Sequence, residues 1–435
     1  GFDSRKARSL TNTADIDPKM PDALETAADL DRRFQQTGKL VGPLHGVVFA
    51  IKDQYDTFDM RTTSGGDVDY ANDRPPEDAT FVKRLRAAGA IILAKANLAE
   101  YAVDGARSSF GGTFCNPYDT EREPGMSSAG SAASVAANLV TCAIGEETVV
   151  SIRWPASVNS LVGIAPTTEL VSRKGMIGAG INMRTGPICR NVADAARVLS
   201  VIRGYDEKDE RTVLSIGRLT PYVTATNLTG MRIGVLREYM SRGFGKADEE
   251  SVVLAENAIA DLRKLGATVI DPGPDGELFK SCIARFGPQA LDSIPQFRDP
   301  ARLANLSLRT LLSPGAEGED KFMINRYLAE RGDANIKTNA DLIAKARFYT
   351  DPNFPDRKQA RQAAERAERY DPSPRTQSRT ALQALLLQCF EDQKLDALMS
   401  PTSTVPPRKL TSSRAMRSGE EVRVSTPVMT ASCMS

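Results

Sequence analysis

Residues 124–167 form a long segment of small side chains with few charges, PGMSSAGSAASVAANLVTCAIGEETVVSIRWPASVNSLVGIAPT. Such low complexity is typical of a linker. The apolar residues Val135, Leu139, Val140 and Ile144 and the ending LVGIAP contradict that interpretation, because a linker does not need them. The segment is therefore expected to be buried, where its serine hydroxyls need hydrogen-bond partners or a chemical role.

Helix and strand patterns alternate along much of the chain. GVVFAIKD, residues 46–53, is a short apolar run suited to a buried strand, with Lys52 at its end. A helical pattern ending near Gly89 is followed by a strand pattern over 90–94, and a later helix closed by Gly266 is followed by a strand over 267–270. This repetition predicts an α/β layered fold.

The pattern divides the chain into four expected segments. An N-terminal helical segment covers residues 1–40 and the core covers 41–271. Short helical pieces broken by PGPDG, SPGAEGED and TDPNFPD indicate a helical insertion over 272–375 that lines or covers a pocket, although a solvated bundle without substrate contact remains an alternative. Residues 376–435 are expected to return to the core.

Charge and composition exclude several classes of protein. With 56 Lys and Arg against 55 Asp and Glu, the net charge is +1, so the sequence lacks the excess of basic residues expected for binding nucleic acid or an anionic membrane. No run approaches the roughly 20 apolar residues of a membrane span, and no signal peptide is evident. Six cysteines without a CxxC pair disfavour a zinc cluster and a disulfide framework. We expect a cytoplasmic monomer or homodimer that acts on a small molecule without metal or cofactor.

The sequence contains one histidine, His45, in the segment GPLHG. A histidine-rich metal site within one chain is therefore excluded. A Ser/His/Asp hydrolase would have to use His45, which we interpret as a turn or core residue. Any serine chemistry in this chain is expected to use another base.

Residues 124–167 resemble the signature of the amidase signature family: a Gly/Ser loop, a small-residue helix and a turn with a nucleophilic serine before SIR and PAS. In that family the first loop serine precedes the nucleophile by 24 residues, as Ser127 precedes Ser151 here. GPLHGVVFAIKD is similar to the segment whose lysine completes the triad, which maps onto Lys52. The resemblance, which runs from about residue 42 to 406 without the insertion, implies a layered α/β/α fold with a mixed central sheet.

The resemblance thus implies a Ser-cisSer-Lys triad, with Ser151 as nucleophile, Ser127 as proton relay and Lys52 as general base. A serine hydroxyl is a weak nucleophile and needs a base within hydrogen-bond reach. A free lysine, with a pKa of about 10.4, is charged at neutral pH, but burial lowers that pKa by up to several units. Lys52 follows five apolar residues, which favours such burial.

The oxyanion hole implied by the resemblance consists of the backbone N–H groups of Thr148, Val149, Val150 and Ser151. Family members usually carry two glycines at 149 and 150 and an aspartate at 147, where this chain has two valines and Glu147. Because valine disfavours positive φ, a turn that needs such angles would be strained or reshaped.

The Gly/Ser loop also departs from the family, with Met126 and Ala129 where glycines are common. Larger side chains narrow or reline a pocket, so Gly125, Met126 and Ser128 are candidates for contact with the substrate. Ser131 is expected to cap a helix. Family members usually continue with a further strand region after STPVMTASCMS, so the natural C-terminus is expected to lie beyond residue 435.

The function implied is hydrolysis of C–N bonds in amides and carbamates through a serine acyl-enzyme, with aryl esters as additional substrates. The altered loop and the two valines resemble a urethane-cleaving (urethanase) subgroup. One alternative is the glutaminase subunit of a tRNA-dependent amidotransferase, which would need partner subunits. Another is a catalytically silent scaffold that binds a ligand, for which Val149 and Val150 argue.

Overall fold

The computed structural model describes residues 20–68, 74–103, 105–217, 227–240, 246–292, 294–299, 301, 316–350 and 357–410. They fall into two compact units. Unit 1 holds the described residues up to 217, from 320 to 366 and from 407 to 410. Unit 2 holds those from 227 to 319 and from 367 to 406.

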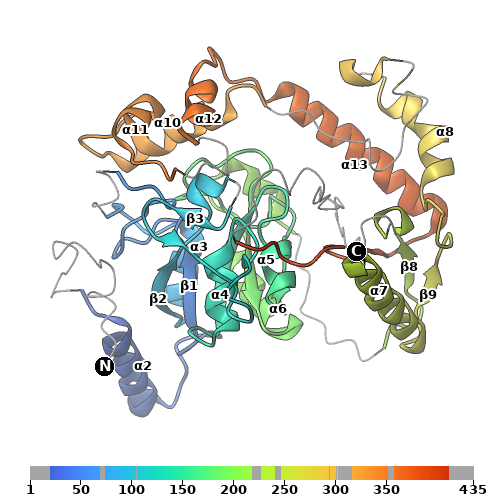
Figure 1. Ribbon diagram of the computed structural model, residues 1–435. Coiled ribbons are helices and arrows are strands. Elements are labelled where there is room, and N and C mark those ends of the chain that lie inside the picture. Colours follow the sequence, from blue (N-terminus) through green and yellow to red (C-terminus); the bar gives the residue numbers. More distant parts are fainter. Residues whose placement is uncertain are drawn as a thin grey trace. The chain divides into compact units, whose positions relative to one another are not determined.

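A five-stranded sheet organises unit 1 (Figure 1). Its order is β2 (Ile91–Ala96), β1 (Val48–Lys52), β5 (Cys142–Glu147), β7 (Arg184–Cys189) and β6 (Val162–Gly163). β1 runs parallel to β2 and β5, whereas β7 runs antiparallel to β5 and β6. The predicted mixed sheet and the α/β fold class are confirmed. A short antiparallel pair joins β3 (Arg107–Ser108) to β4 (Gly112–Thr113).

Helix α2 of unit 1 begins and ends where the sequence provides caps. α2 starts with a capping box between Asp22 and Glu25 and ends at Gly38, whose φ is +65°. The helices are α2 (Ala23–Thr37), α3 (Thr80–Ala87), α4 (Ala129–Ala136), α5 (Arg153–Val158), α6 (Val192–Ile202), α10 (Glu319–Arg331), α11 (Asn339–Lys345) and α12 (Arg357–Glu365), with 3₁₀ turns η3 (Glu100–Ala102) and η4 (Glu210–Ser215).

Strand β1 separates two cores in unit 1. Phe49 and Ile51 pack in a cluster with side chains of α3 and α6, whereas Ala50 packs with Val135 of α4. Successive side chains of a strand point to opposite faces. Lys52, two residues after Ala50, therefore leaves β1 on the side that α4 covers.

Helix α4 explains why the small-residue segment is buried. Its residues Ala129, Ser131, Ala132 and Val135 are all buried. A Cβ at Gly130 would lie 2.4 Å from the carbonyl oxygen of Asn97, so the helix packs directly on the backbone that follows β2. Only small side chains allow this approach, which sets the position of the loop before α4.

Unit 2 contains a parallel three-stranded sheet in the order β10, β8, β9. Its core lies mainly between α8 and α13, with Phe279, Ile283, Leu385 and Cys389 buried. The elements are β8 (Arg232–Val235), η5 (Arg237–Tyr239), α7 (Lys246–Lys264), β9 (Thr268–Ile270), α8 (Lys280–Ala290), η6 (Pro295–Phe297), α13 (Ser373–Gln393) and β10 (Ala397–Met399). The predicted insertion 272–375 contributes helices to both units, and its role at a pocket stays a prediction.

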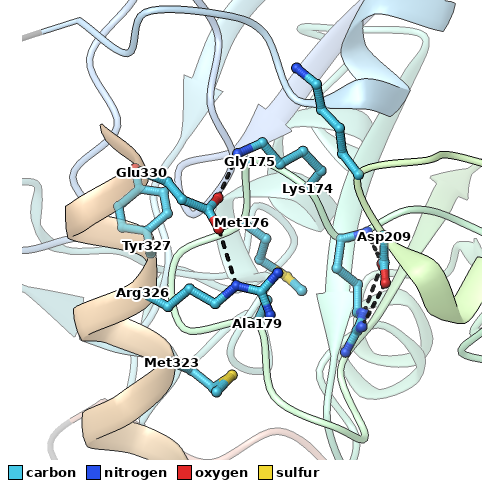
Figure 2. Close-up of a pocket in the computed structure, with 11 residues that line it drawn as sticks. Lys174, Gly175, Met176, Ala179, Asp209, Met323, Arg326, Tyr327 and Glu330 are labelled. Carbon is cyan, nitrogen blue, oxygen red and sulfur yellow. Dashed lines mark hydrogen bonds and ion pairs between the residues drawn. The ribbon is translucent and has the colours of Figure 1, made fainter. Parts of the chain in front are cut away.

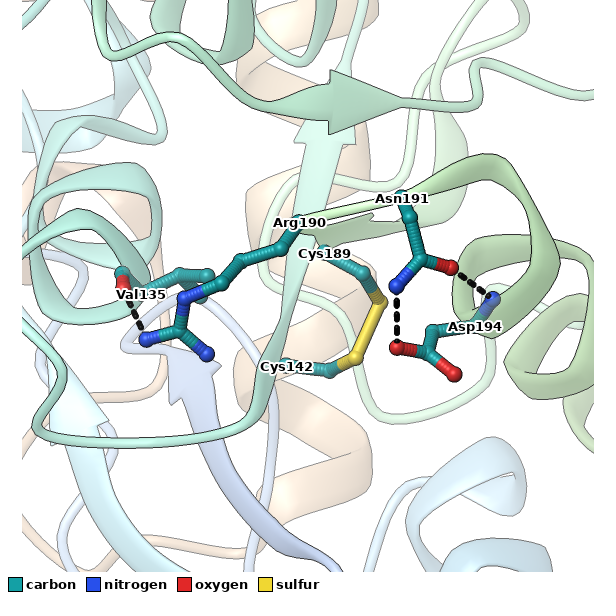
Figure 3. Close-up of a disulfide and its surroundings, with 6 residues drawn as sticks. All are labelled: Val135, Cys142, Cys189, Arg190, Asn191 and Asp194. Atoms are coloured by element: carbon teal, nitrogen blue, oxygen red, sulfur yellow. Dashed lines mark hydrogen bonds between the residues drawn. A yellow bond between two sulfur atoms is a disulfide. The ribbon is translucent and has the colours of Figure 1, made fainter.

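Two disulfides correct the expectation drawn from cysteine spacing. Cys142 and Cys189 face each other on the antiparallel strands β5 and β7, with 4.5 Å between their Cα atoms (Figure 3). Cys282 of α8 is bonded to Cys389 of α13. The partners are 47 and 107 residues apart, so strand and helix pairing, not a local motif, brings them together. The cysteines therefore no longer support the prediction of a reducing, cytoplasmic location.

Replacing Cys282 and Cys389 together by alanine is expected to lower the free energy of unfolding by about 2–4 kcal/mol, because the bond closes a long loop in the unfolded chain. Urea unfolding of the oxidised proteins measures this difference. Cys115→Ala, at a half-buried free cysteine, is the control. The same double variant compared with the parent under reducing conditions should show no comparable loss; equal stabilities of the oxidised proteins would contradict the prediction.

In the described part of the chain, no helix combines the length and the apolar character that crossing a bilayer requires. The cytoplasmic location stays a prediction.

Candidate active site

Three segments of unit 1 meet at the carboxyl ends of β1 and β5. Lys52 is the last residue of β1. Ser127 lies in the loop before α4, and Ser151 lies in the turn between β5 and α5. The segments are distant in sequence, and the packing of α4 on the sheet brings them together.

Lys52 and Ser127 are in direct contact. The Lys52 ammonium nitrogen Nζ donates to Ser127 Oγ at 2.8 Å, and both side chains are buried. The Met126–Ser127 peptide bond is cis, as the resemblance implied for this serine. Asp53, the next residue along the chain, pairs with Lys95 of β2 at 2.9 Å and not with Lys52.

Ser151 lies beside the loop that carries Ser127. The backbone N–H of Ser128 donates to the Ser151 carbonyl at 3.3 Å. Ser151 is half-buried, and within the described residues its hydroxyl has no hydrogen-bond partner. The structure therefore brings the predicted nucleophile, relay and base into one place.

The turn before Ser151 has an ordinary backbone. Neither Val149 nor Val150 has a positive φ, so the valines adopt the turn without the strain that such angles would impose. Across the described ranges, the N–H groups of residues 148–151 donate to no acceptor. Four successive unengaged donors can receive a developing negative charge.

The side chain of Glu147 holds this turn through hydrogen bonds. One of its carboxylate oxygens accepts hydrogen bonds from the backbone N–H groups of Ile152 and Arg153, at 3.1 and 3.0 Å. The other accepts from Arg153 Nε at 2.9 Å, and the same guanidinium donates to the Val149 carbonyl at 2.7 Å. Arg153 and Glu147 therefore form an ion pair that holds the turn.

Glu146 is a residue of the site that the sequence analysis missed. Its Oε2 lies 2.9 Å from Lys52 Nζ, and both side chains are fully buried. Its other carboxylate oxygen accepts from Thr148 Oγ1 at 2.8 Å. The available signal was the pair of adjacent glutamates at the end of the apolar strand CAIG, where a buried charge needs a partner.

Burial and charge act in opposite directions on Lys52. Burial lowers the pKa of its ammonium group from the ordinary 10.5, and the charge and hydrogen bond of Glu146, with a smaller contribution from Glu147, oppose this shift. Nearby, burial raises the pKa of Tyr55 well above 10.0, so its hydroxyl, 2.8 Å from Thr185 Oγ1, stays neutral.

The three candidates for substrate contact occupy different surroundings. Gly125 is buried with a φ of +79°, and a Cβ there would lie 2.7 Å from Pro155 Cα, so glycine is required. Ser128 is buried, and its hydroxyl donates to the Glu146 carbonyl at 3.0 Å. Met126 is half-buried, with its sulfur 3.3 Å from Gly105 N.

Ser131 is not a helix cap, contrary to expectation. Helix α4 begins at Ala129, so Ser131 lies in its first turn and faces the sheet. Its hydroxyl donates to the Ile144 carbonyl of β5 at 3.0 Å. The position before the helix belongs to Ser128, which makes no side-chain cap.

A separate hollow of about 50 Å³ lies between α10 and the loop 173–179 (Figure 2). Glu330 of α10 pairs with Lys174 at 2.5 Å and with Arg326 at 3.1 Å, and Arg173 pairs with Asp209. No residue of the predicted triad lines it. Its volume is far below the roughly 300–1,000 Å³ of a small-molecule site.

Known proteins resemble this chain in sequence. A protein-family model described as amidase matches residues 5–286, more than half of the chain. The A subunit of glutamyl-tRNA(Gln) amidotransferase from Symbiobacterium thermophilum is 40% identical over 277 residues, 60% of this chain and 55% of that protein. The corresponding protein of Cupriavidus metallidurans is 40% identical over 279 residues, 61% and 54%. The chain thus spans about half the length of these relatives.

Solved structures extend the likeness to the fold. The peptide amidase of Stenotrophomonas maltophilia is 29% identical, with a TM-score of 0.61 over 92% of this chain and 79% of that one. The A subunit of the Thermotoga maritima glutamyl-tRNA(Gln) amidotransferase is 27% identical, with a TM-score of 0.56 over 88% and 74%.

Proposed function

Because this chain belongs to the amidase family, we propose that it hydrolyses amide-type C–N bonds through an acyl-enzyme on Ser151. The observation that carries the proposal is the buried contact of 2.8 Å between Lys52 Nζ and Ser127 Oγ, in a loop bonded to the backbone of Ser151. A base, a relay hydroxyl and a hydroxyl without a partner are the parts that serine catalysis without histidine requires.

In the acylation step, Ser151 Oγ attacks the substrate carbonyl carbon. Its proton passes to Ser127 Oγ while the Ser127 proton passes to Lys52 Nζ, which must be the neutral amine to accept it. The carbonyl oxygen becomes an oxyanion that the N–H groups of residues 148–151 receive. Electrons return from the oxyanion as the C–N bond breaks.

The relay then runs in reverse. The leaving nitrogen takes a proton from Ser127, which recovers one from Lys52, because an amine departs poorly as an anion. Water attacks the acyl-enzyme along the same path and releases the carboxylic acid. An aryl ester carries a better leaving group, so it should also be cleaved.

We further propose carbamates as a second substrate class. A carbamate presents the same carbonyl carbon and nitrogen leaving group as an amide. Support comes from Met126, Val149 and Val150, which stand where the family usually has glycine, and from the resemblance of this pattern to the urethane-cleaving subgroup. Val149 is 51% exposed and Met126 is half-buried, so both could contact a substrate.

A second candidate is the glutaminase function within a tRNA-dependent amidotransferase. The 40% identity to the two curated amidotransferase proteins favours it. That function would release ammonia from glutamine and depend on added partner subunits. Hydrolysis of bulky substrates by the isolated chain would oppose it.

The decisive measurement compares the parent protein with Ser151→Ala on matched nitroanilide, aryl carbamate and aryl ester substrates across a pH series. Ser151→Ala is expected to lower turnover by at least about 10⁴-fold, because it removes the hydroxyl that forms the acyl-enzyme. Ser157→Ala, at an exposed serine of α5, is the matched control and should retain parental rates.

Each outcome assigns a different function. Loss of turnover in Ser151→Ala alone supports the acyl-enzyme, and the order of rates then identifies the bond class. Equal rates for Ser151→Ala and the parent overturn the assignment of Ser151. A parent that cleaves none of the substrates but releases ammonia from glutamine with partner subunits is part of an amidotransferase. Inactivity in every assay leaves the ligand-binding scaffold.

A further inference from the structure

The carboxylate of Glu146 is built into the surroundings of Lys52. Its Oε2 lies 2.9 Å from Nζ, and its backbone carbonyl accepts from the same nitrogen at 3.3 Å. Thr148 holds the other carboxylate oxygen, and Ser128 holds the Glu146 backbone by accepting from its N–H at 3.2 Å. Glu146 therefore contacts the lysine through two groups and is itself fixed on two sides.

The other charged and titratable groups packed around Lys52 are bonded elsewhere. They are Glu147, which pairs with Arg153 of α5, Asp53, which pairs with Lys95 of β2, and Tyr55, which is hydrogen-bonded to Thr185 of β7. Among the residues that the structure describes, Glu146 is the carboxylate at ion-pair distance from Lys52.

We propose that Glu146 is a positioning residue for the hydrolysis, holding Lys52 Nζ against Ser127 and making Lys52 a stronger base that acts at more alkaline pH than a lone buried lysine would. This inference rests on the proposed function. Two of the three Nζ hydrogens of the ammonium form point to Glu146 and one to Ser127, so the geometry leaves the amine lone pair facing Ser127 when Lys52 is neutral.

The chemistry follows from where the charge appears. Before acylation, neutral Lys52 lies beside the Glu146 carboxylate. When Ser151 attacks, the relayed proton converts Lys52 into an ammonium ion, and the new charge forms next to an existing negative charge. In a buried site this attraction is large, so the proton transfer is favoured. The same attraction retains the proton on Lys52 up to a higher pH. The neutral, active form of Lys52 therefore appears only at that higher pH.

The test is the pH dependence of kcat/KM for one acyl group as an aryl ester and as a nitroanilide. The parent is compared with Glu146→Gln and Glu146→Asp. In the profile of kcat/KM against pH, the rise on the acidic side, the acidic limb, is expected about one pH unit or more lower for Glu146→Gln than for the parent. The plateau value of kcat/KM should be about tenfold lower, because the base becomes weaker. Glu146→Asp keeps the charge at a greater distance, so its limb should lie between the other two.

Glu100→Gln is the matched control, since Glu100 is also fully buried but bonds the backbone of Ser109 and Tyr349. Its acidic limb should coincide with that of the parent. A Glu146→Gln limb that is unchanged or moves to higher pH overturns the inference, and if that variant does not fold, a Glu146→Asp limb identical to the parent's does so. Ser151→Ala is assayed in parallel. If it remains active, the proposed function fails; if it alone is inactive, an unshifted limb rejects only the role of Glu146.

Discussion

Replacing Lys52 by methionine is expected to lower amide hydrolysis by roughly a thousandfold or more, because the relay loses its base. The same change leaves the fully buried Glu146 carboxylate without its cation. Breaking a buried ion pair on one side costs about 3–5 kcal/mol, so the free energy of unfolding should fall by a similar amount. Kinetics and urea unfolding at neutral pH measure the two losses separately.

The double variant Lys52→Met with Glu146→Gln separates chemistry from stability. The glutamine that replaces Glu146 carries no charge, so most of the lost stability should return, whereas activity should stay at the level of the single variant. If the double variant recovered activity together with stability, Lys52 would act through the fold and not as the base. If Lys52→Met were as stable as the parent, Glu146 would not be buried as an ion in the native protein.

Gly130→Ala is expected to destabilise the protein by about 3 kcal/mol, although alanine in a helix is ordinarily the more favourable residue by about 1 kcal/mol. The added Cβ would lie 2.4 Å from the carbonyl oxygen and 2.7 Å from the nitrogen of Asn97, and backbone atoms cannot rotate away. Helix α4 would have to move off the sheet, carrying Ser127 with it. A displacement of about 1 Å in a catalytic group lowers rates roughly a hundredfold.

Thermal unfolding and kcat/KM check this prediction. Ser134→Ala in the same helix is the control, since its hydroxyl donates to the Ser131 carbonyl one turn earlier. That variant should stay within about 0.5 kcal/mol of the parent and keep its rate. A Gly130→Ala protein more stable than the parent would show that α4 does not pack closely on Asn97.

The sequence predicted the local elements and the meeting of Lys52, Ser127 and Ser151. It did not predict the carboxylate that lies beside Lys52. The apolar run ending in Lys52 and the small residues of α4 each identify a buried element, and motif order relates them. Glu146 was missed because its partner lies 94 residues earlier in the chain, and nothing local distinguishes it from Glu147. Lys52 and Glu146 pair because both are buried. Whether a strand end is buried depends on the assembled sheet, so the local sequence could not show it.

The disulfides and Ser131 were misread for a related reason. Cys142 and Cys189 become opposite residues only once the register of β5 and β7 is set, and spacing along the chain does not contain that register. Ser131 was assigned to a cap, but α4 begins at Ala129, so the position before the helix belongs to Ser128, three residues earlier. The two valines before Ser151 could not be judged from preference alone, since the turn proved not to use positive φ.

The contact between Lys52 and Ser127 spans 75 residues of chain, and it forms only when β1, the loop before α4 and β5 have all been assembled. Contacts between residues so far apart in sequence arise late in folding, because loop closure must first be compensated by packing. A partly folded chain with its helices formed would therefore still hold the base and the relay apart. The base and the relay would therefore come together only with the assembled sheet of unit 1.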